Sequence, residues 1–259
     1  VQTCALPIYK LRYSFETYAV SGARKGDKST GAISYPLYLS ATFKHNGLNE
    51  STGYDYSRLQ NPTREEAEKT IALLENGKEA LAFSCGMAAL TACVHLFKSG
   101  DHVILSEDLY GGTFRLFDEV YSVYNIEASF IDTSDINKVK DAIRSNTRGI
   151  IIETPSNPLM RVTDIKAISD ICKAKNIISI VDNTFLTPYY QRPLELGADI
   201  VVHSGTKYLG GHNDVLAGFA ISNNEEIIEK LRFMQKSTGA ILSPFDSWLL
   251  LRGVKTLHI

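Results

Sequence analysis

Three side chains that could do chemistry follow apolar runs of the sequence, at points where a buried strand would end. Asp182 follows IISIV, Lys207 lies three residues after the run ADIVVHS, and Asn157 lies in the segment TPSNP after GIIIE. A buried carboxylate is costly unless it is paired, and a lysine beside hydroxyl-bearing residues just past a buried strand is unusual for a surface lysine. Taken singly, Asp182 also fits a helix cap or a salt bridge, and Lys207 also fits a solvated loop.

A fourth feature is the helix start that follows the apolar run EALAF. Ser84, Cys85, Gly86 and Met87 stand there, and small residues at a helix N-terminus leave backbone amides free to bind an anion such as phosphate. An amine, a carboxylate and a phosphate-binding helix start together match a cofactor that carries an aldehyde, a ring nitrogen and a phosphate. The sequence therefore predicts pyridoxal 5′-phosphate (PLP) as the cofactor.

Other kinds of site are poorly supported by the sequence. No GxGxxG follows a strand, so a dinucleotide site is not expected, and neither a GxxxxGK[ST] phosphate loop nor a GxSxG nucleophile turn occurs. The cysteines and histidines show no metal-ligand spacing, so we expect no metal. His203 and His212, which flank Lys207, are interpreted as packing or loop residues.

Charge and composition narrow the function further. The 259 residues include 27 Lys and Arg and 29 Asp and Glu, a net charge of −2 that lacks the basic excess of a nucleic-acid-binding protein. No apolar run approaches the roughly 20 residues of a membrane span. Cys4, Cys85, Cys93 and Cys172 form no CxxC pair, and three of them lie in apolar segments. We therefore expect reduced thiols and a cytoplasmic location.

The elements that must position these residues alternate along the chain. Six short apolar runs separated by segments with helical spacing predict an α/β fold, with a mostly parallel sheet and helices on both faces. The expected strands are 79–83, 102–106, 126–130, 148–153, 177–182 and 198–204, and the helices between them include 86–97, 135–145 and 164–175. Because ligands bind beyond the carboxyl ends of parallel strands, the polar residues that follow these strands are expected to form one site.

Four segments are expected along the chain. Residues 1–8 (VQTCALPI) resemble a translated sequencing adapter, residues 9–53 are predicted to form an extended N-terminal arm, residues 54–243 the α/β domain, and residues 244–259 the start of a C-terminal domain. A helix is predicted in 61–77, with a Thr63–Glu66 capping box and a left-handed Gly77 at its end. The chain stops in a helical stretch without a cap, so we expect a fragment whose C-terminal domain is truncated.

Six ordered motifs resemble those of the Cys/Met-metabolism (trans-sulfuration) PLP-dependent enzymes. The motifs are YDYSRLQNPTR (54–64), SCGMAAL (84–90), DLYGGTFR (108–115), ETPSNPL (153–159), VDNTF (181–185) and HSGTKYLGGH (203–212). The resemblance covers the chain from about residue 15 to its last residue. It implies a fold-type I PLP-dependent transferase that forms a homotetramer, with two subunits building each site.

The resemblance also implies a role for each matching residue. Lys207 resembles the lysine that forms the Schiff base and moves protons, Asp182 the partner of the pyridinium nitrogen, and Tyr110 the ring that stacks on the cofactor and moves protons. The other implied cofactor contacts are Gly86, Met87, Ser204 and Thr206 at the phosphate, Tyr56 and Arg58 at the phosphate of a neighbouring subunit, and Asn157 at the phenolic oxygen.

The reaction implied by the resemblance is γ-replacement on an activated homoserine, of the cystathionine γ-synthase or O-acetylhomoserine (thiol)-lyase type. A cystathionine γ- or β-lyase is the alternative within the family, and a catalytically silent PLP-binding or assembly module is the alternative of another class. Gly112 stands where methionine γ-lyases have cysteine, which argues against methionine as the main substrate. The family's arginine for the substrate carboxylate belongs to the C-terminal domain, beyond residue 259.

Overall fold

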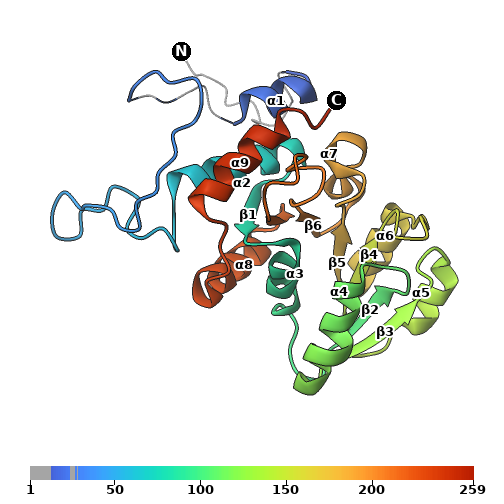
Figure 1. Cartoon of the computed structure of the whole chain (residues 1–259). Coiled ribbons are helices and arrows are strands. Elements are labelled where there is room, and N and C mark those ends of the chain that lie inside the picture. Colours follow the sequence, from blue (N-terminus) through green and yellow to red (C-terminus); the bar gives the residue numbers. More distant parts are fainter. Residues whose placement is uncertain (1–12, 24–26, 28) are drawn as a thin grey trace, which may run out of the picture.

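A seven-stranded sheet organises the chain in the computed structural model, which describes residues 13–23, 27 and 29–259 (Figure 1). The strands are β1 (Glu79–Phe83), β2 (His102–Ser106), β3 (Glu127–Ile131), β4 (Thr147–Glu153), β5 (Ile178–Asp182), β6 (Ile200–Ser204) and β7 (Gly218–Ser222). Their order is β1-β7-β6-β5-β4-β2-β3; β7 pairs antiparallel with β1 and β6, and the other pairings are parallel. The predicted α/β fold is confirmed.

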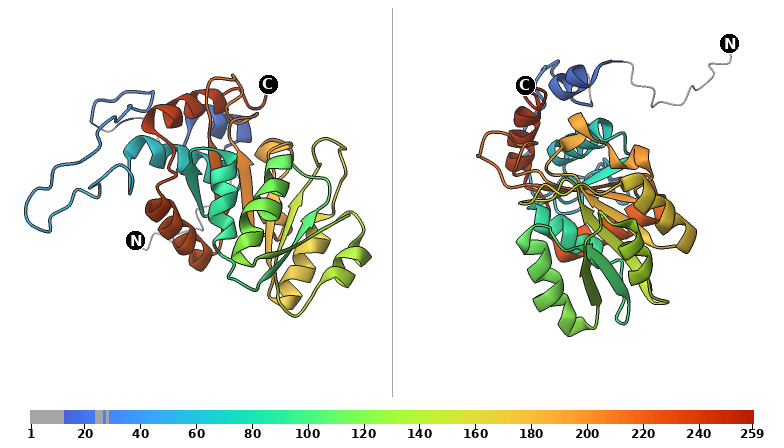
Figure 2. Two further views of the ribbon diagram at one scale, coloured as in Figure 1. Left: turned by 60° about the horizontal axis from the view of Figure 1, so that its bottom comes forward. Right: turned by 90° about the vertical axis from the view of Figure 1, so that its right-hand side faces the viewer.

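Helices pack on both faces of this sheet (Figure 2). One face carries α3 (Gly86–Val94), α8 (Glu225–Thr238), and α4 (Gly111–Arg115) continued by the π-helical η1 (Leu116–Tyr121). The other face carries α2 (Pro62–Leu74), α5 (Ile136–Ala142), α6 (Ile165–Lys175) and α9 (Pro244–Val254). The short helices α1 (Phe15–Ser21), α7 (Thr187–Tyr190), η2 (Ser122–Tyr124) and η3 (Pro193–Leu196) complete the described set.

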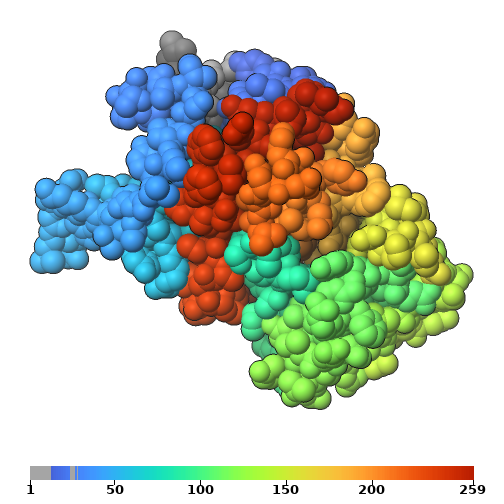
Figure 3. All heavy atoms as spheres, in the orientation of Figure 1, coloured from blue at the N-terminus to red at the C-terminus, as the bar shows by residue number. Residues whose placement is uncertain are grey.

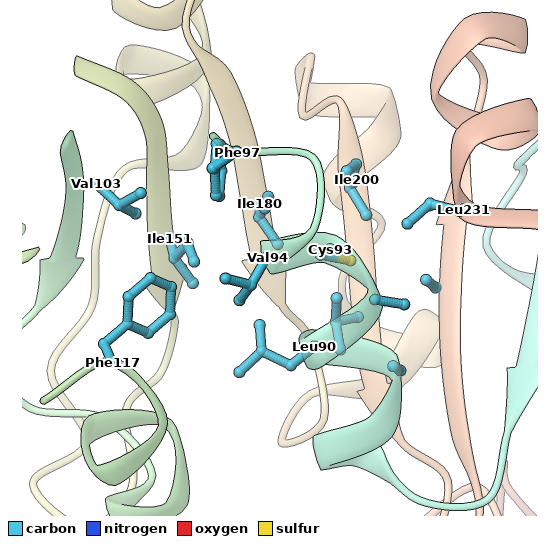
Figure 4. Packing of buried hydrophobic residues seen from close by; sticks show 14 of the residues in the cluster. Leu90, Cys93, Val94, Phe97, Val103, Phe117, Ile151, Ile180, Ile200 and Leu231 are labelled. Carbon is cyan, nitrogen blue, oxygen red and sulfur yellow. The ribbon is translucent and has the colours of Figure 1, made fainter. Parts of the chain in front are cut away.

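The contact between α3 and the central strands fixes the place where α3 begins (Figure 4). Leu90, Cys93 and Val94 of α3 lie in one buried cluster with Ile180 of β5 and Ile200 of β6. Fully burying such an aliphatic side chain contributes roughly 1.5–3 kcal/mol, so this contact holds the N-terminus of α3 beside the strand ends. Burial raises the pKa of the Cys93 thiol to about 12, and this cysteine therefore acts as a small apolar side chain.

The start of α2 differs from the sequence prediction. Asn61 is the N-cap, and its side-chain oxygen accepts hydrogen bonds from the amides of Thr63 (2.9 Å) and Arg64 (3.3 Å). The Thr63 hydroxyl instead donates to the carbonyl of Pro36 (2.9 Å) and accepts from the amide of Tyr38 (2.9 Å). The predicted Thr63 capping box is wrong because the asparagine before the N1 proline caps the helix, which leaves Thr63 to anchor the N-terminal segment.

Other differences lie at element ends. Asn76, with φ 56°, takes the left-handed position predicted for Gly77; a Cβ on Gly77 would instead lie 2.3 Å from Ile221 Cγ2. The helices expected over 86–97 and 135–145 end earlier, at Val94 and Ala142. Strand β7 was not predicted, and neither was α1, which lies in the expected arm and buries Ala19.

The ends of the chain contribute unequally to what the structure describes. Residues 1–8, the adapter-like segment with Cys4, lie outside the described residues. The segment around residues 30–55 projects from the body of the molecule (Figure 3). At the other end, α9 packs on α2 and places Leu250 and Val254 in the buried cluster of that face. Within the described ranges, no helix has the length and apolar character needed to cross a membrane.

Candidate active site

Lys207 lies in a tight loop directly after β6, at the carboxyl edge of the parallel strands. Its amide donates to the carbonyl of Ser204 (3.2 Å), and the amide of Gly211 donates to the carbonyl of Lys207 (2.8 Å). The Lys207 side chain is exposed, and its ammonium makes no hydrogen bond or ion pair with the residues that the structure describes. The amine is therefore available to a ligand.

Close backbone packing holds this lysine loop in place. A Cβ on Gly253 of α9 would lie 2.0 Å from the carbonyl oxygen of Gly210, so the helix rests directly on the loop. The hydroxyl of Thr206 accepts from the amide of Ala217 (3.1 Å), which ties the loop to the segment before β7. The predicted phosphate ligand Thr206 thus lies beside Lys207 with its hydroxyl already bonded to the backbone.

The N-terminus of α3 approaches the end of β6 closely. A Cβ on Gly86 would lie 2.8 Å from Ser204 Cβ. Cys85, the N-cap of α3, makes no side-chain cap hydrogen bond, and among described residues the amides of Gly86 and Met87 have no acceptor. Free amides at a helix N-terminus together with the Ser204 hydroxyl form an anion-binding edge. The structure therefore brings three predicted phosphate ligands together: Gly86, Met87 and Ser204.

Asp182 ends β5 with its side chain on the same face as Ile180, beneath α3. Burial raises the pKa of its carboxyl, while the Thr184 hydrogen bonds and the nearby His203 act in the opposite direction. The amide of Thr184 donates to Asp182 Oδ1 (3.0 Å), and the Thr184 hydroxyl accepts from the amide of Ser204 (2.8 Å). Because an isolated buried anion is unfavourable, the Asp182 carboxylate is suited to a cationic partner.

Glu153, which was not predicted as a site residue, is a second carboxylate at this edge. It ends β4, is the register partner of Asp182, and lines the same pocket beside Leu109. Burial and, secondarily, the Asp182 charge raise the pKa of Glu153 to about 7, while hydrogen bonds from two backbone amides act against that shift. Its sequence signal is the one that selected Asp182, an acidic residue closing an apolar strand.

Tyr110 and Asn157 lie in the loops that follow β2 and β4. The amide of Tyr110 donates to Glu153 Oε2 (2.7 Å), and the amide of Asn157 donates to Glu153 Oε1 (3.0 Å). A Cβ on Gly112 would lie 2.4 Å from Tyr110 Cε1 and 3.0 Å from Met87 Sδ. The Tyr110 ring therefore lies over the first turn of α4 and close to the start of α3, and 49% of the residue is exposed.

The two histidines beside Lys207 stay out of the site. His203 faces the opposite side of the sheet, where its Nε2 lies 2.5 Å from Glu75 Oε1 and both side chains are fully buried. Asn183 Nδ2 donates to the same Glu75 oxygen (2.9 Å). His212 is exposed, and its Nδ1 bonds the Gly210 carbonyl (2.9 Å). The packing and loop roles expected of these histidines agree with this geometry.

Tyr56 and Arg58 are not brought to the lysine loop of their own chain. The Arg58 guanidinium carbon lies 5.3 Å from the centroid of the Tyr56 ring, and its Nη1 donates to the carbonyl of Lys236 near the end of α8. Neither side chain bonds or stacks with Lys207, Asp182 or Tyr110 in the described part of the chain. That part also holds no group of three or more His, Cys, Asp or Glu side chains placed to bind a metal.

The chain has close relatives of several named activities. It is 52% identical over 244 residues to a cystathionine γ-lyase of Bacillus subtilis (strain 168), covering 94% of this chain and 64% of the relative. It is 51% identical to a cystathionine γ-synthase/O-acetylhomoserine (thiol)-lyase of the same strain, covering 94% of this chain and 65% of the relative. A cystathionine β-lyase of Lactococcus lactis subsp. cremoris (strain MG1363) is 50% identical, covering 95% of this chain and 65% of the relative. The chain thus spans less than two thirds of the length of these relatives.

Fold comparison gives the same grouping. The crystal structure of a cystathionine γ-lyase from Lactobacillus plantarum, complexed with L-serine, matches with a TM-score of 0.93 and 45% identity, covering 95% of this chain and 64% of that one. The family model described as "Cys/Met metabolism PLP-dependent enzyme" matches residues 16–259. The chain belongs to the Cys/Met-metabolism PLP-dependent enzyme family.

Proposed function

We propose that this chain forms the cofactor-binding part of a PLP-dependent enzyme that performs γ-replacement on an activated homoserine. The observation that carries the proposal is the convergence of an unpaired amine, a partly buried carboxylate and free helix amides at one edge of the sheet. These groups belong to Lys207, Asp182 and the start of α3. The Cys/Met-metabolism family supports the substrate class, an amino acid with a leaving group on its side chain.

The residues at this edge fit PLP group by group. When bound, PLP supplies a sink for electrons released at the α-carbon of an amino acid. Lys207 Nζ would hold the cofactor aldehyde and move the α-proton, and the Asp182 carboxylate would keep a ring nitrogen protonated. The Gly86 and Met87 amides would bind the phosphate with the Ser204 and Thr206 hydroxyls. The Tyr110 ring would cover the cofactor, and Asn157 would contact its phenolic oxygen.

The second candidate is C–S bond cleavage of the cystathionine γ- or β-lyase type. It is favoured by the lyases at 52% and 50% identity, as γ-replacement is favoured by the γ-synthase/thiol-lyase at 51%. Both reactions begin with proton removal from the α-carbon and require the same Lys207 and Asp182. The silent-module alternative is disfavoured because the Asp182 carboxylate, which forms no ion pair with the described residues, lowers stability unless a ligand supplies a cationic group.

Product analysis distinguishes these reactions. The full-length gene product, loaded with PLP, is given an acylated homoserine with cysteine in one tube and cystathionine alone in another, and products are followed by mass spectrometry. Accumulation of cystathionine in the first tube supports γ-replacement. Loss of cystathionine in the second shows a lyase, and the released keto acid identifies the broken C–S bond. No turnover in either tube contradicts both reactions and favours the silent module.

Replacing the lysine tests the site itself. We expect Lys207→Ala to remove the visible absorption band of lysine-bound PLP and to lower turnover by at least about 10²–10⁴-fold, the contribution of a general acid–base group. Lys173→Ala, an exposed lysine at the end of α6, is the matched control and should keep both. A Lys207→Ala protein that retains turnover would refute the assignment of Lys207.

We also infer a homotetramer with sites shared between two subunits, no nucleic-acid or membrane partner, and a cytoplasmic location. The exposed turn with Tyr56 and Arg58 supports a shared site. The net charge of −2 lacks the basic excess of a nucleic-acid-binding protein. The free thiols of Cys85, Cys93 and Cys172 support a reducing compartment.

A further inference from the structure

The Glu153 carboxylate accepts hydrogen bonds from two loops, one carrying Tyr110 and the other Asn157, the predicted contacts to the cofactor. Its Oε2 accepts from the amide of Tyr110 (2.7 Å) and its Oε1 from the amide of Asn157 (3.0 Å). The first bond joins residues 43 positions apart in the sequence. Each carboxylate oxygen therefore holds the backbone of one loop, and the two loops share a single anchor at the end of β4.

A second carboxylate reinforces this connection from the opposite loop. Asp108 Oδ2 accepts from the hydroxyl of Ser156 and from the amide of Leu159 (3.2 Å). The Ser156 hydroxyl in turn accepts from the amide of Arg161 (2.9 Å). The loop after β2 thus reaches into the loop after β4 through Asp108, and the loop after β4 reaches back through Glu153.

Glu153 occupies a position where a carboxylate is costly for folding. Asp182 faces it from the neighbouring strand β5, Asp108 from the loop after β2, and neither can neutralise it. No cationic side chain in the described chain forms an ion pair with Glu153. What favours this residue is its pair of amide hydrogen bonds, because a charged acceptor makes stronger bonds than a neutral one.

We propose that Glu153 is a positioning residue that fixes the Tyr110 ring and the Asn157 amide relative to each other for binding of the PLP ring. The inference rests on the proposed function, because it assigns that ring to the same site. In this role Glu153 acts through its hydrogen bonds to the backbone of Tyr110 and Asn157, and not through contact with the cofactor or substrate.

Glutamine tests the two-acceptor requirement with little change in volume. A glutamine side chain has one acceptor oxygen and one NH₂ group, so one of the two loop amides would face a donor. At about pH 8.5, above the pKa of about 7 and thus with the Glu153 carboxylate ionised, we expect Glu153→Gln to weaken PLP binding by about tenfold, the effect of one lost charge-assisted hydrogen bond. We also expect a reduced visible circular dichroism signal per bound PLP, because the Tyr110 ring is less well placed.

Two further variants test whether the effect of Glu153→Gln comes from the lost hydrogen bonds, from the lost charge, or from a general loosening of the two loops. Glu153→Asp keeps the charge but is too short to hold both amides, so it should resemble Glu153→Gln. Glu107→Gln removes the ion pair with Arg161 on the same two loops, where both side chains are more than 40% exposed. This control should leave the circular dichroism of bound PLP unchanged.

The cofactor-free protein provides an independent measurement. The pKa of Glu153 is raised from 4.5 to about 7, so the folded state binds a proton that the unfolded state has released. Stability due to this group is present at low pH and is lost as pH rises through that window. The Tm of the wild type relative to Glu153→Gln should therefore fall between about pH 5 and about pH 8.

Each result decides the inference. If the wild type shows the visible band and Lys207→Ala lacks it, the proposed function stands. If PLP affinity and circular dichroism are then unchanged in Glu153→Gln, the positioning role is overturned. If Glu153→Gln has a lower Tm than the wild type but the same circular dichroism signal per bound PLP, the role of Glu153 is merely structural, and the positioning role is again overturned. A Tm difference that is independent of pH contradicts the partly buried position of Glu153 beside Asp182 and Asp108, and with it the inference. A wild-type protein without the band refutes the proposed function and this inference with it.

Discussion

Gly112 limits where the Tyr110 ring can lie. A Cβ at this position would lie 2.4 Å from Tyr110 Cε1 and 3.0 Å from Met87 Sδ. Real Cβ atoms do not approach other atoms so closely, so any larger residue must displace the ring or the methionine. The ring of Tyr110 is the more mobile of the two because half of that residue is exposed and Met87 is packed against the buried core.

We expect Gly112→Ala to displace the Tyr110 ring and to lower turnover by about 10²-fold, since misplacing a site group by about 1 Å has effects of this size. The adjacent Gly111→Ala is the matched control, because nothing lies within 4 Å of its added Cβ. Steady-state kinetics and the visible circular dichroism of bound PLP would measure both variants. Equal effects of the two substitutions would show that the space beside the Tyr110 ring is not limiting.

At the residue scale, the sequence predicts those site residues whose side chains lie at the ends of predicted strands. Lys207, Asp182 and Ser204 lie at or just after the ends of apolar runs, and the parallel strands bring such positions to one edge of the sheet. The role of Glu153 could not be predicted in this way. Its partners are backbone amides, which nearly every residue type has, so the identities of Tyr110 and Asn157 do not reveal these hydrogen bonds. Their proximity depends on the register of β4 and on the two loops that follow β2 and β4.

Helix α9 supports the lysine loop through a contact that excludes side-chain atoms. A Cβ on Gly253 would lie 2.0 Å from the carbonyl oxygen of Gly210, and Leu250 of the same helix approaches Gly205. The close contact with α9 therefore fixes the position of the loop that carries Lys207. This makes α9 a structural neighbour of the site, although it belongs to the segment 244–259 that the sequence assigns to the start of another domain.

We expect Gly253→Ala to destabilise the protein, although alanine in a helix interior is usually favoured over glycine by about 1 kcal/mol. Overpacking against Gly210 should cost about 1–3 kcal/mol and shift the lysine loop, so PLP affinity should fall as well. Ser237→Ala, at an exposed position of α8, is the control for helix propensity alone. Thermal unfolding and PLP titration would measure both, and an increased Tm for Gly253→Ala would contradict the contact.

At the element scale, the sequence predicts six of the seven strands because each lies in a short, mostly apolar run bounded by turns. β7 was missed because it follows a loop instead of a helix, begins with Gly218, and pairs antiparallel between β1 and β6. The cap of α2 was misassigned because Asn61 and Thr63 both have capping side chains. Only the tertiary contact of Thr63 with Pro36 decides between them.

At the scale of the whole molecule, the turn with Tyr56 and Arg58 is built to present these side chains outward. The buried Arg64 donates through Nη1 to the carbonyl of Ser57 (2.7 Å) and through Nη2 to that of Leu59 (2.9 Å). Both carbonyls flank Arg58, whose side chain is exposed and stacks over the Tyr56 ring. The side chains of this firmly held turn do not contact Lys207 or Asp182 of their own chain among the described residues, so they are free to reach the site of a second copy.

Mixed oligomers test whether the site is shared. We expect Lys207→Ala and Arg58→Ala homo-oligomers each to lose most of their activity at limiting PLP. In a two-fold pair of one subunit of each kind, one site carries both substitutions and the other carries neither. Differently tagged subunits, co-expressed and purified through both tags, should therefore recover about half of the wild-type turnover per pair.

The matched control pairs Lys207→Ala with Asp182→Asn, which lie in the site of a single chain. Every site in that mixed pair lacks one of the two groups, so no turnover should return. Recovery in the Arg58 pair and none in the Asp182 pair places Arg58 opposite Lys207 across a subunit boundary. Failure of the Arg58 pair to recover, with intact mixed oligomers isolated, would show that Arg58 serves its own subunit, and the exposed turn would then require another role.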